Sequence, residues 1–505
     1  MVTLVTIDGN SLTIDEVVAV ARGNAQVRVS GDSIEKMEES HQMVNQLLAG
    51  KKVVYGITTG FGKFSNVVIS RDETEQLQKN LIMSHAAGVG SPLPEEVVRA
   101  IMLLRANALA KGFSGARPDV VDTLVRMLNH HVHPVIPEKG SVGSSGDLAP
   151  LSHMVLVMIG MGEAFYQGTR LSGGMAMEQA GITPLRLEAK EGLALINGTQ
   201  VMTAIAALAV FDARRLAQTA DIVAALTVEA AEGIVDAFDD KLQQVRPHRG
   251  QMQSAALLRE LLADSQILAA AGHKRVQDAY SLRCIPQVHG ASRDAIDYVG
   301  KVVEVEINSA TDNPLIFPDA GEVISGGNFH GQPVALAMDF LGIALSELAN
   351  ISERRIERLV NPQLSGLPAF LTEKGGLNSG YMIAQYTAAS LVSENKVLAH
   401  PASVDSIPTS GNQEDHVSMG TIAARKARSI LENVQYVLAV ELLCAVQGID
   451  FRGRKPGAGT AKAYASVRNR IPKLGDDRVI CHDIEEAVHI IRDETLIQAV
   501  GSLAG

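Results

Sequence analysis

Hydrophobic positions recur with a helical period over most of the chain. Residues 74–85, 94–111 and 117–128 show the spacing of amphipathic helices in the N-terminal third. Longer runs follow at 201–237, from the 326–331 loop to Val360, and at about 417–447, and Asn361–Pro362 marks a stop. The run that ends at Val360 predicts a helix roughly 40 Å long at 1.5 Å per residue. Strand-like runs are few and brief, as in residues 51–55.

Composition favours the same fold class. Ala, Leu, Val and Ile dominate the 505 residues, aromatic residues make up 4%, Trp is absent, and 46% of the residues are hydrophobic. We therefore predict a mainly α-helical protein with a large core. A change from mixed to long-helical pattern near residues 112–118 predicts a smaller N-terminal domain, 1–112, and an elongated helical domain, 113–505, whose long helices form a central bundle.

Charge and cysteine content limit the functions to consider. The formal net charge of −11 gives no electrostatic support for binding nucleic acid or an anionic membrane. Three scattered cysteines do not form a disulfide framework and fit a reducing compartment, so we expect a cytoplasmic protein. The sequence shows no secretory signal and no run of about 18 apolar residues, which predicts no membrane insertion.

The stretch GSVGSSGDLAP at residues 140–150 carries the strongest candidate chemistry. Small residues from Gly143 to Gly146 allow a sharp bend, and an apolar helix follows Asp147. One interpretation is a turn with a helix cap. In the other, Gly146 N attacks the Ser144 carbonyl, water is lost, and loss of the Ser145 hydroxyl leaves a methylidene-imidazolone. This electrophile would lie beside a helix N-terminus, which favours developing negative charge.

Polar or aromatic residues recur at other junctions between loops and helices. The additional candidates are Tyr55, His85, Asn197, Tyr280, Arg283, Asn313, Phe329 and Glu414. Each alone has a structural alternative: Arg283 can cap a helix, Asn197 suits a left-handed turn, and Glu414 can be solvated at a helix start. The nearby His130, His131 and His133 lack acidic or thiol partners at ligand spacing, so we predict a helix terminus there and no metal site.

Taken together, the motifs resemble the aromatic amino-acid ammonia-lyase family, and within it the members that act on histidine. The similarity runs from about Tyr55 to Arg425. It rests on YGITTGFGKFS, LIMSHAAGVG, RANALAKGFSG, GSVGSSGDLAPLSH, EGLALINGTQ, QDAYSLRCIPQVHG, ATDNPLIF, GGNFHGQP, ERRIERLVNPQL and NQEDHVSMG. The resemblance implies a mainly helical homotetramer whose active sites draw on more than one subunit.

The resemblance also implies a role for each candidate. Ser144, Ser145 and Gly146 would form the methylidene-imidazolone autocatalytically, so no diffusible cofactor is expected. Tyr55 matches the proposed β-proton base, and Asn197 and Tyr280 match residues that support the electrophile and handle protons. Substrate contacts are implied for the carboxylate anchors Arg283 and Asn313, for Phe329 beside the prosthetic group, and for His85 and Glu414 facing the substrate ring.

Two positions depart from the family pattern. Ser144 stands where Ala is usual, but only its carbonyl takes part in ring closure. Thr58 replaces an expected Asn next to Tyr55, which alters the surroundings of the proposed base.

The pair His85 and Glu414 predicts the substrate. An imidazole ring has two nitrogens that need partners, whereas a phenyl ring beside Glu414 would leave a carboxylate unpaired. We therefore expect L-histidine to be converted to urocanate and ammonia. The alternatives are a phenylalanine or tyrosine ammonia-lyase with the same electrophile, a fumarase-like lyase, whose GSS signature should continue differently, and a non-catalytic helical scaffold.

Overall fold

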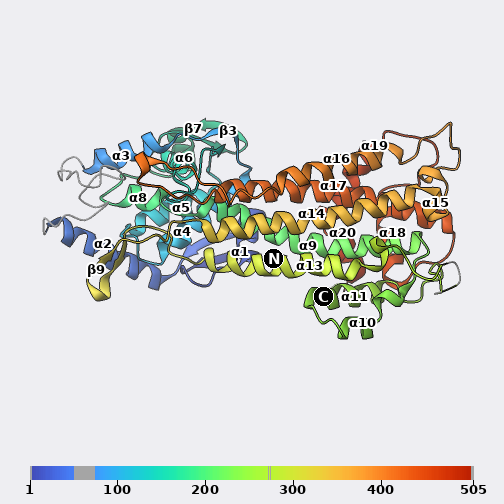
Figure 1. The fold of residues 1–505 in the computed structure, drawn as a ribbon. Helices are drawn as coiled ribbons and strands as arrows, with labels where there is room; N and C mark the ends of the chain where they lie inside the picture. The colour runs from blue at the N-terminus through green and yellow to red at the C-terminus, as the bar shows by residue number, and fades with distance from the viewer. Residues whose placement is uncertain (1–2, 50–73, 271, 273–274, 502–505) are drawn as a thin grey trace. The chain divides into compact units, whose positions relative to one another are not determined.

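The computed structural model describes residues 3–49, 74–270, 272 and 275–501 and confirms a mainly α-helical fold (Figure 1). Its contacts define two compact units. Unit 1 comprises Met1–Phe211, Gly300–Asp339 and Pro401–Arg425, and unit 2 comprises Asp212–Val299, Phe340–His400 and Lys426–Gly505. The predicted domains, 1–112 and 113–505, are each one continuous segment, whereas each unit is made of three segments. Residue 112 lies within unit 1, and the predicted domain division stays a prediction.

Four long helices each contribute residues to both units. They are α9 (Gln200–Ala230), α13 (Ile285–Glu306), α14 (Gln332–Val360) and α17 (Gly420–Arg452). The end of α14 at Val360 agrees with the stop signal in the sequence, since Asn361 accepts a hydrogen bond from Gln363 N and starts the next helix.

In its described residues, unit 1 combines helices with four small sheets. Its helices are α1 (Ile14–Ala21), α2 (Gly31–Ala49), α3 (Thr74–His85), α4 (Glu95–Ala110), α5 (Pro118–Asn129), α6 (Leu148–Met158), α7 (Gly173–Gln179) and α8 (Glu191–Ile196). Its strands are β1 (Leu4–Ile7), β2 (Gln26–Val29), β3 (Val89–Pro92), β4 (His133–Pro134), β5 (Pro137–Lys139), β6 (Glu163–Tyr166), β7 (Thr169–Ser172), β8 (Leu315–Phe317) and β9 (Glu322–Ile324). Strands β1 and β2 pair in parallel, whereas β3–β5, β4–β6–β7 and β8–β9 are antiparallel.

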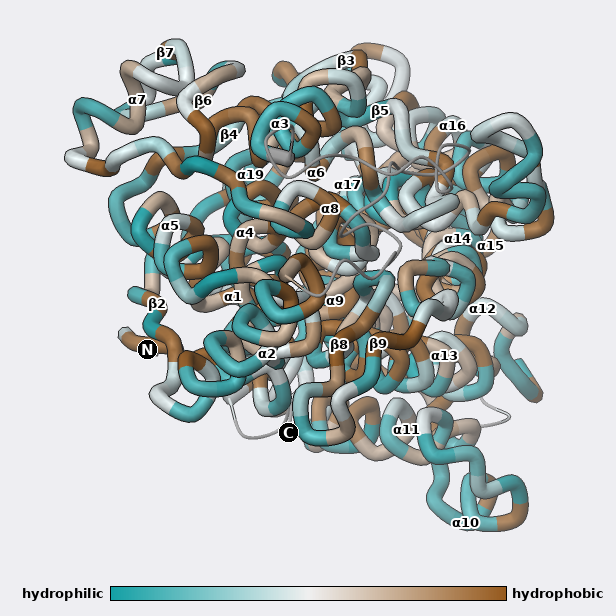
Figure 2. The backbone as a smooth tube through the Cα atoms, turned by 90° about the vertical axis from the view of Figure 1, so that its left-hand side faces the viewer, coloured by the Kyte–Doolittle hydropathy of each residue, from teal (hydrophilic) through white to brown (hydrophobic). Residues whose placement is uncertain are grey.

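Helix α4 lies in the core of unit 1, and every residue from Val97 to Ala110 is buried. Two of these are arginines, Arg99 and Arg105, and each donates hydrogen bonds to buried acceptors. Helix α2 differs, because it buries only Ser33, Met37, Ser40 and Val44 and is largely hydrophilic in colour in Figure 2.

Arg99 also contacts the histidine cluster that follows α5. Helix α5 ends at Asn129 with His130 as its C-cap, so these histidines mark a helix terminus as predicted. Arg99 Nη1 donates to His133 Nε2 at 3.1 Å. Burial and the nearby Arg99 charge lower the pKa of His133 to about 3, so His133 is neutral at physiological pH.

Unit 2 consists of the remaining parts of the long helices and shorter helices around them. The shorter helices are α10 (Asp240–Gln244), α11 (Arg249–Leu261), α12 (Tyr280–Arg283), α15 (Pro362–Ser365), α16 (Met382–Leu398), α18 (Ala458–Arg468), α19 (Ile480–Arg492) and α20 (Thr495–Val500). Within this unit the long helices run alongside one another (Figure 1) and exchange buried hydrogen bonds. Glu441 of α17 accepts from Thr227 of α9 and pairs with Arg355 of α14.

Two of the long helices, α14 and α17, are apolar and long enough to cross a membrane by length and composition alone. In each, most of the apolar window is buried inside the structure, 67% and 78% respectively. Their hydrophobicity is therefore explained by their place in the protein core.

Candidate active site

The 140–150 loop has a backbone that requires glycine. Gly143 and Gly146 have φ values of +67° and +73°, in the left-handed region that side chains disfavour. Gly146 pairs with Gly198, and a Cβ atom at Gly146 would lie 2.2 Å from Gly198 O. Ser144 is buried and Ser145 is half-buried. The Ser144–Gly146 segment is thus held tightly against the turn that starts α9.

Asp147 fixes this loop to two distant segments. Its side chain makes no capping bond to α6, which begins at the next residue. Instead, Oδ2 accepts from Val201 N and Met202 N at 3.0 and 2.9 Å, at the start of α9. The hydroxyls of Ser141 and Thr421 donate to Oδ1. Burial raises the pKa of Asp147, while these hydrogen bonds act to lower it. The side chain therefore caps a helix other than the one that the sequence indicates.

Ser145 contacts one of the predicted substrate residues. Its Oγ donates to Glu414 Oε1 at 3.1 Å, across 269 positions of sequence. Thr409 Oγ1 donates to the other carboxylate oxygen, Oε2, at 2.6 Å. Thr409 and Glu414 also form an antiparallel bridge, which fixes the backbone that carries the carboxylate.

His85, at the end of α3, lies near the same carboxylate. Its Nδ1 is 2.9 Å from Leu81 O, so Nδ1–H donates and Nε2 is the acceptor in the neutral ring. Burial lowers the pKa of His85, and the Leu81 hydrogen bond and the Glu414 charge act against this shift. His85, Ser145 and Glu414 are therefore brought together in unit 1.

Asn197 and Asn313 are also brought together. Asn197 Nδ2 donates to the backbone oxygen of Asn313 at 3.1 Å and to Asp312 Oδ1 at 3.2 Å. Asn313 Oδ1 accepts from Gly326 N at 2.7 Å and from Ser325 Oγ at 3.2 Å. Since Gly198 pairs with Gly146, Asn197 lies one residue from the contact with the 140–150 loop.

A family model for "Aromatic amino acid lyase" matches residues 12–469. The chain belongs to the aromatic amino acid lyase family. A histidine ammonia-lyase from Caldanaerobacter subterraneus subsp. tengcongensis is 67% identical over 489 residues, which cover 97% of this chain and 96% of the relative. These matches confirm the predicted family and make this protein a carbon–nitrogen lyase.

Solved structures of related proteins agree in fold. The crystal structure of histidine ammonia-lyase from Trypanosoma cruzi matches with a TM-score of 0.92 and 45% identity, over 98% of this chain and 95% of that one. Tyrosine aminomutase from Streptomyces globisporus matches with a TM-score of 0.95 and 40% identity, over 98% of both chains. The fold of this aromatic amino acid lyase is thus shared by a histidine ammonia-lyase and by a tyrosine aminomutase.

The remaining predicted residues of the lyase have varied positions. Phe329 is half-buried in the turn before α14, and Tyr55 lies outside the described residues. Tyr280 and Arg283 belong to α12 in unit 2, where Arg283 Cζ lies 4.6 Å from the centre of the Tyr280 ring. The Tyr280 side chain is 71% exposed. The phenol of Tyr280 is therefore largely open to solvent.

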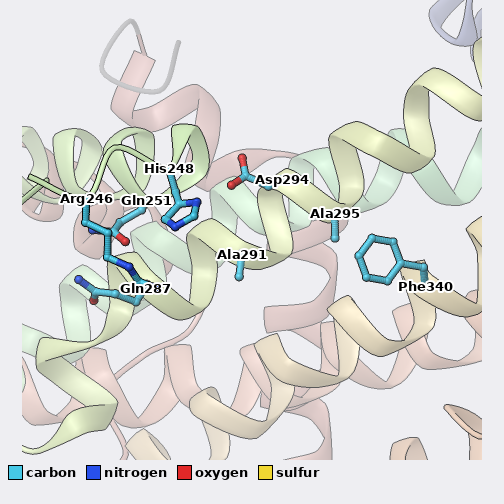
Figure 3. Close-up of a pocket in the computed structure, with 8 residues that line it drawn as sticks. All are labelled: Arg246, His248, Gln251, Gln287, Ala291, Asp294, Ala295 and Phe340. Carbon is cyan, nitrogen blue, oxygen red and sulfur yellow. The ribbon is translucent and has the colours of Figure 1, made fainter. Parts of the chain in front are cut away.

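The described part of unit 2 also contains two pockets, one of which is lined by Arg283. The first has a volume of about 350 Å³ (Figure 3) and is lined by Arg246, His248, Gln251, Gln287, Ala291, Asp294, Ala295 and Phe340. The second, of about 320 Å³, includes both Arg283 and Gln287. Gln287 therefore lines both pockets. Asp294 has a structural role, because its Oδ1 accepts a hydrogen bond from Gly250 N at the start of α11.

Two buried charged residues that contact the candidate site were not predicted from the sequence. Arg105 Nη1 donates to Asn197 O at 3.0 Å, and Lys190 Nζ donates to Asp312 Oδ2 at 2.6 Å. Arg105 and Lys190 are fully buried, and burial lowers the pKa of Arg105 to about 10. Arg105 opens the motif RANALAKGFSG, and Lys190 directly precedes EGLALINGTQ. A charged residue within an apolar helix is the signal that could have identified Arg105.

Proposed function

We propose that this lyase eliminates ammonia from L-histidine to give urocanate, with a methylidene-imidazolone formed from Ser144, Ser145 and Gly146. The observation that carries the proposal is the contact between Ser145 and Glu414, with His85 close to the same carboxylate. Two groups suited to an imidazole thus lie beside the residues expected to form the electrophile. Its close similarity to histidine ammonia-lyases supports the same substrate.

The residues of the loop fit the prosthetic group. Ring closure between Gly146 N and the Ser144 carbonyl needs a residue without a side chain at 146, and Gly198 O leaves no room for one. Asp147 holds the end of the triplet through four donors from three segments. When formed, the group supplies an electrophilic methylidene carbon at the position of Ser145.

His85 and Glu414 offer acceptors to a substrate ring. His85 Nδ1–H is committed to Leu81 O, which leaves Nε2 as an acceptor, and the Glu414 carboxylate accepts only. Histidine can donate a ring N–H to such groups, whereas a phenyl ring has no polar hydrogen to offer. A buried carboxylate against a phenyl ring would carry an uncompensated desolvation cost.

The other roles follow the family pattern. Arg283 and Asn313 would anchor the substrate carboxylate, because a guanidinium fork matches a carboxylate with two hydrogen bonds. Tyr55 would remove the β-proton, with Asn197 and Tyr280 near the reacting groups and Phe329 packed beside the ring. A tyrosine near pKa 10 needs neighbours that stabilise its phenolate to act as a base at neutral pH.

Active sites shared between subunits of a cytoplasmic homotetramer are also part of the proposal. Tyr280 is largely exposed on unit 2, which supports its use by another subunit. Sedimentation should give a tetramer. A monomer that turns over substrate at the normal rate would contradict shared sites.

The substrate is tested by incubating the protein separately with L-histidine, L-phenylalanine and L-tyrosine. The ultraviolet absorbance of each unsaturated acid reports the product. We expect urocanate from histidine and little product from the other two. Faster release of cinnamate than of urocanate at equal substrate concentration would overturn the assignment in favour of phenylalanine.

A further inference from the structure

Lys190 and Asp312 form a buried ion pair that has no part in the roles given so far. Lys190 Nζ and Asp312 Oδ2 are 2.6 Å apart, and both side chains are at most 1% exposed. Taking two charges out of water costs solvation free energy, and buried pairs can often be replaced by apolar residues without loss of stability. Stability alone therefore does not explain the presence of this pair.

The second oxygen of the same carboxylate determines the orientation of Asn197. Asn197 Nδ2 donates to Asp312 Oδ1 and to the backbone oxygen of Asn313. An ionised carboxylate and a carbonyl can only accept. If the amide rotated by half a turn, its oxygen would face two acceptors. Lys190 Nζ donates to the other oxygen, Oδ2, and so holds the carboxylate in the position from which Oδ1 accepts from Asn197.

The oxygen of the Asn197 amide, Oδ1, remains available for a contact in the active site. Asn197 Oδ1 is buried and has no hydrogen-bond partner among the described residues. The next residue, Gly198, pairs with Gly146 of the electrophile loop. Arg105 holds the Asn197 backbone oxygen, so both the backbone and the amide of Asn197 are fixed.

We propose that Lys190 and Asp312 are positioning residues for catalysis, which act through Asn197 by presenting its amide oxygen, rather than its amide nitrogen, on the side away from Asp312. The proposal rests on the proposed function, because the family pattern places Asn197 in the active site. Lys190 and Asp312 themselves do not touch the substrate.

A double-mutant cycle tests the coupling. The four proteins are the parent, Asn197→Ala, Asp312→Asn and the double variant. For each, intact mass gives the fraction of subunits with the ring, and kcat is expressed per ring-bearing subunit. Asp312→Asn should lower this kcat about tenfold or more in the parent, the size expected for a lost hydrogen bond to a charged group. In the Asn197→Ala background the same change should lower it less than twofold.

Lys190→Met provides a second route to the same answer, since it removes the charge but keeps an unbranched chain. It should show the same coupling to Asn197. Asp339→Asn is the matched control, because Asp339 is a buried carboxylate of unit 1 that accepts from Ser403 N at 2.7 Å. Its kcat should stay within twofold of the parent.

Independent effects of Asp312→Asn and Asn197→Ala would overturn the positioning role. So would failure of both Asp312→Asn and Lys190→Met to fold, as judged by unfolding temperature, because the pair would then be structural. If the parent deaminates phenylalanine or tyrosine instead of histidine, the proposed function fails and the cycle is measured on that product. A parent that deaminates none of the three refutes both proposals.

Discussion

Ser145 Oγ donates a hydrogen bond to Glu414 Oε1 over 3.1 Å. Formation of the ring removes this hydroxyl, so Oε1 loses its donor while Oε2 keeps the hydrogen bond from Thr409. The maturation that we propose thus frees one carboxylate oxygen beside the new electrophile, where it can accept from the substrate ring.

Glu414→Gln should therefore impair histidine turnover. The variant keeps the size of the side chain but loses the charge, and we expect kcat to fall about tenfold to a hundredfold. Inhibition by glycine, which carries only the amino-acid backbone, should change little. Asp415→Asn, at the exposed neighbouring carboxylate, is the control. Equal losses in histidine turnover and glycine inhibition would argue against contact with the ring.

Intact mass tests the electrophile directly. The purified protein should be lighter than its sequence mass by two waters, with ultraviolet absorbance that a nucleophile abolishes. Ser145→Ala should restore at least one water and remove nearly all activity. Ser144→Ala should form the ring as the parent does, because only the backbone of residue 144 takes part. An unmodified mass in a fully active protein would disprove ring formation.

Gly146→Ala should prevent maturation and lower stability. A Cβ at this position would overlap Gly198 O, and such overpacking typically costs about 1–3 kcal/mol or more. Gly181→Ala is a matched control, since Gly181 has a similar φ of +68° with open space around it. The free energy of unfolding of the control should fall only by about 1–2 kcal/mol, the cost of placing alanine in the left-handed conformation. Calorimetry and intact mass would compare the two, and equal unfolding temperatures would contradict the close approach.

His133 should make unit 1 sensitive to acid. Its pKa is about 3 when folded, against an ordinary value of 6.5, so the unfolded chain binds more protons between these values. Stability that is present above pH 6.5 is lost as the pH falls toward 3, at up to about 1.4 kcal/mol per pH unit. His133→Gln should therefore show a smaller drop in unfolding temperature between pH 6.5 and 4.5. The exposed His130→Gln should behave as the parent does.

Arg283→Lys should lower kcat/KM for histidine about tenfold or more. Lysine keeps the positive charge but loses the planar fork that matches a carboxylate and that lies over the Tyr280 ring. Steady-state kinetics would measure the change. If the lysine variant equals the parent, the carboxylate anchor is another residue.

Local signals in the sequence predicted much of the helical structure. Helix α3 occupies Thr74–His85 as expected, and α14 ends where Asn361–Pro362 disfavours further helix. The first helix, α1, begins with a capping box formed by Thr13 and Glu16. Periodicity, proline and cap residues act over a few positions, so they can be recognised without tertiary structure.

The partners within the site could not be predicted in the same way. The sequence predicted a helix directly after Asp147, and α6 begins there, but the Asp147 carboxylate binds the start of α9, more than 50 positions later. The pairing of Lys190 with Asp312 spans 122 positions. Such contacts depend on how distant segments pack, which short-range patterns do not encode. The family motifs predicted candidate residues for the site but gave no orientation for the Asn197 amide.

The hydrogen bonds to the Asp147 carboxylate also have a consequence for when the electrophile can form. The donors come from the loop itself, from the start of α9 and from Thr421, and Ser145 meets Glu414 only when that late segment is in place. A chain still emerging from the ribosome, with about 400 residues made, lacks both Glu414 and Thr421. The electrophile would then form only after folding is complete. The fraction of ring-bearing protein in a preparation would then equal the fraction of molecules that had reached the native state.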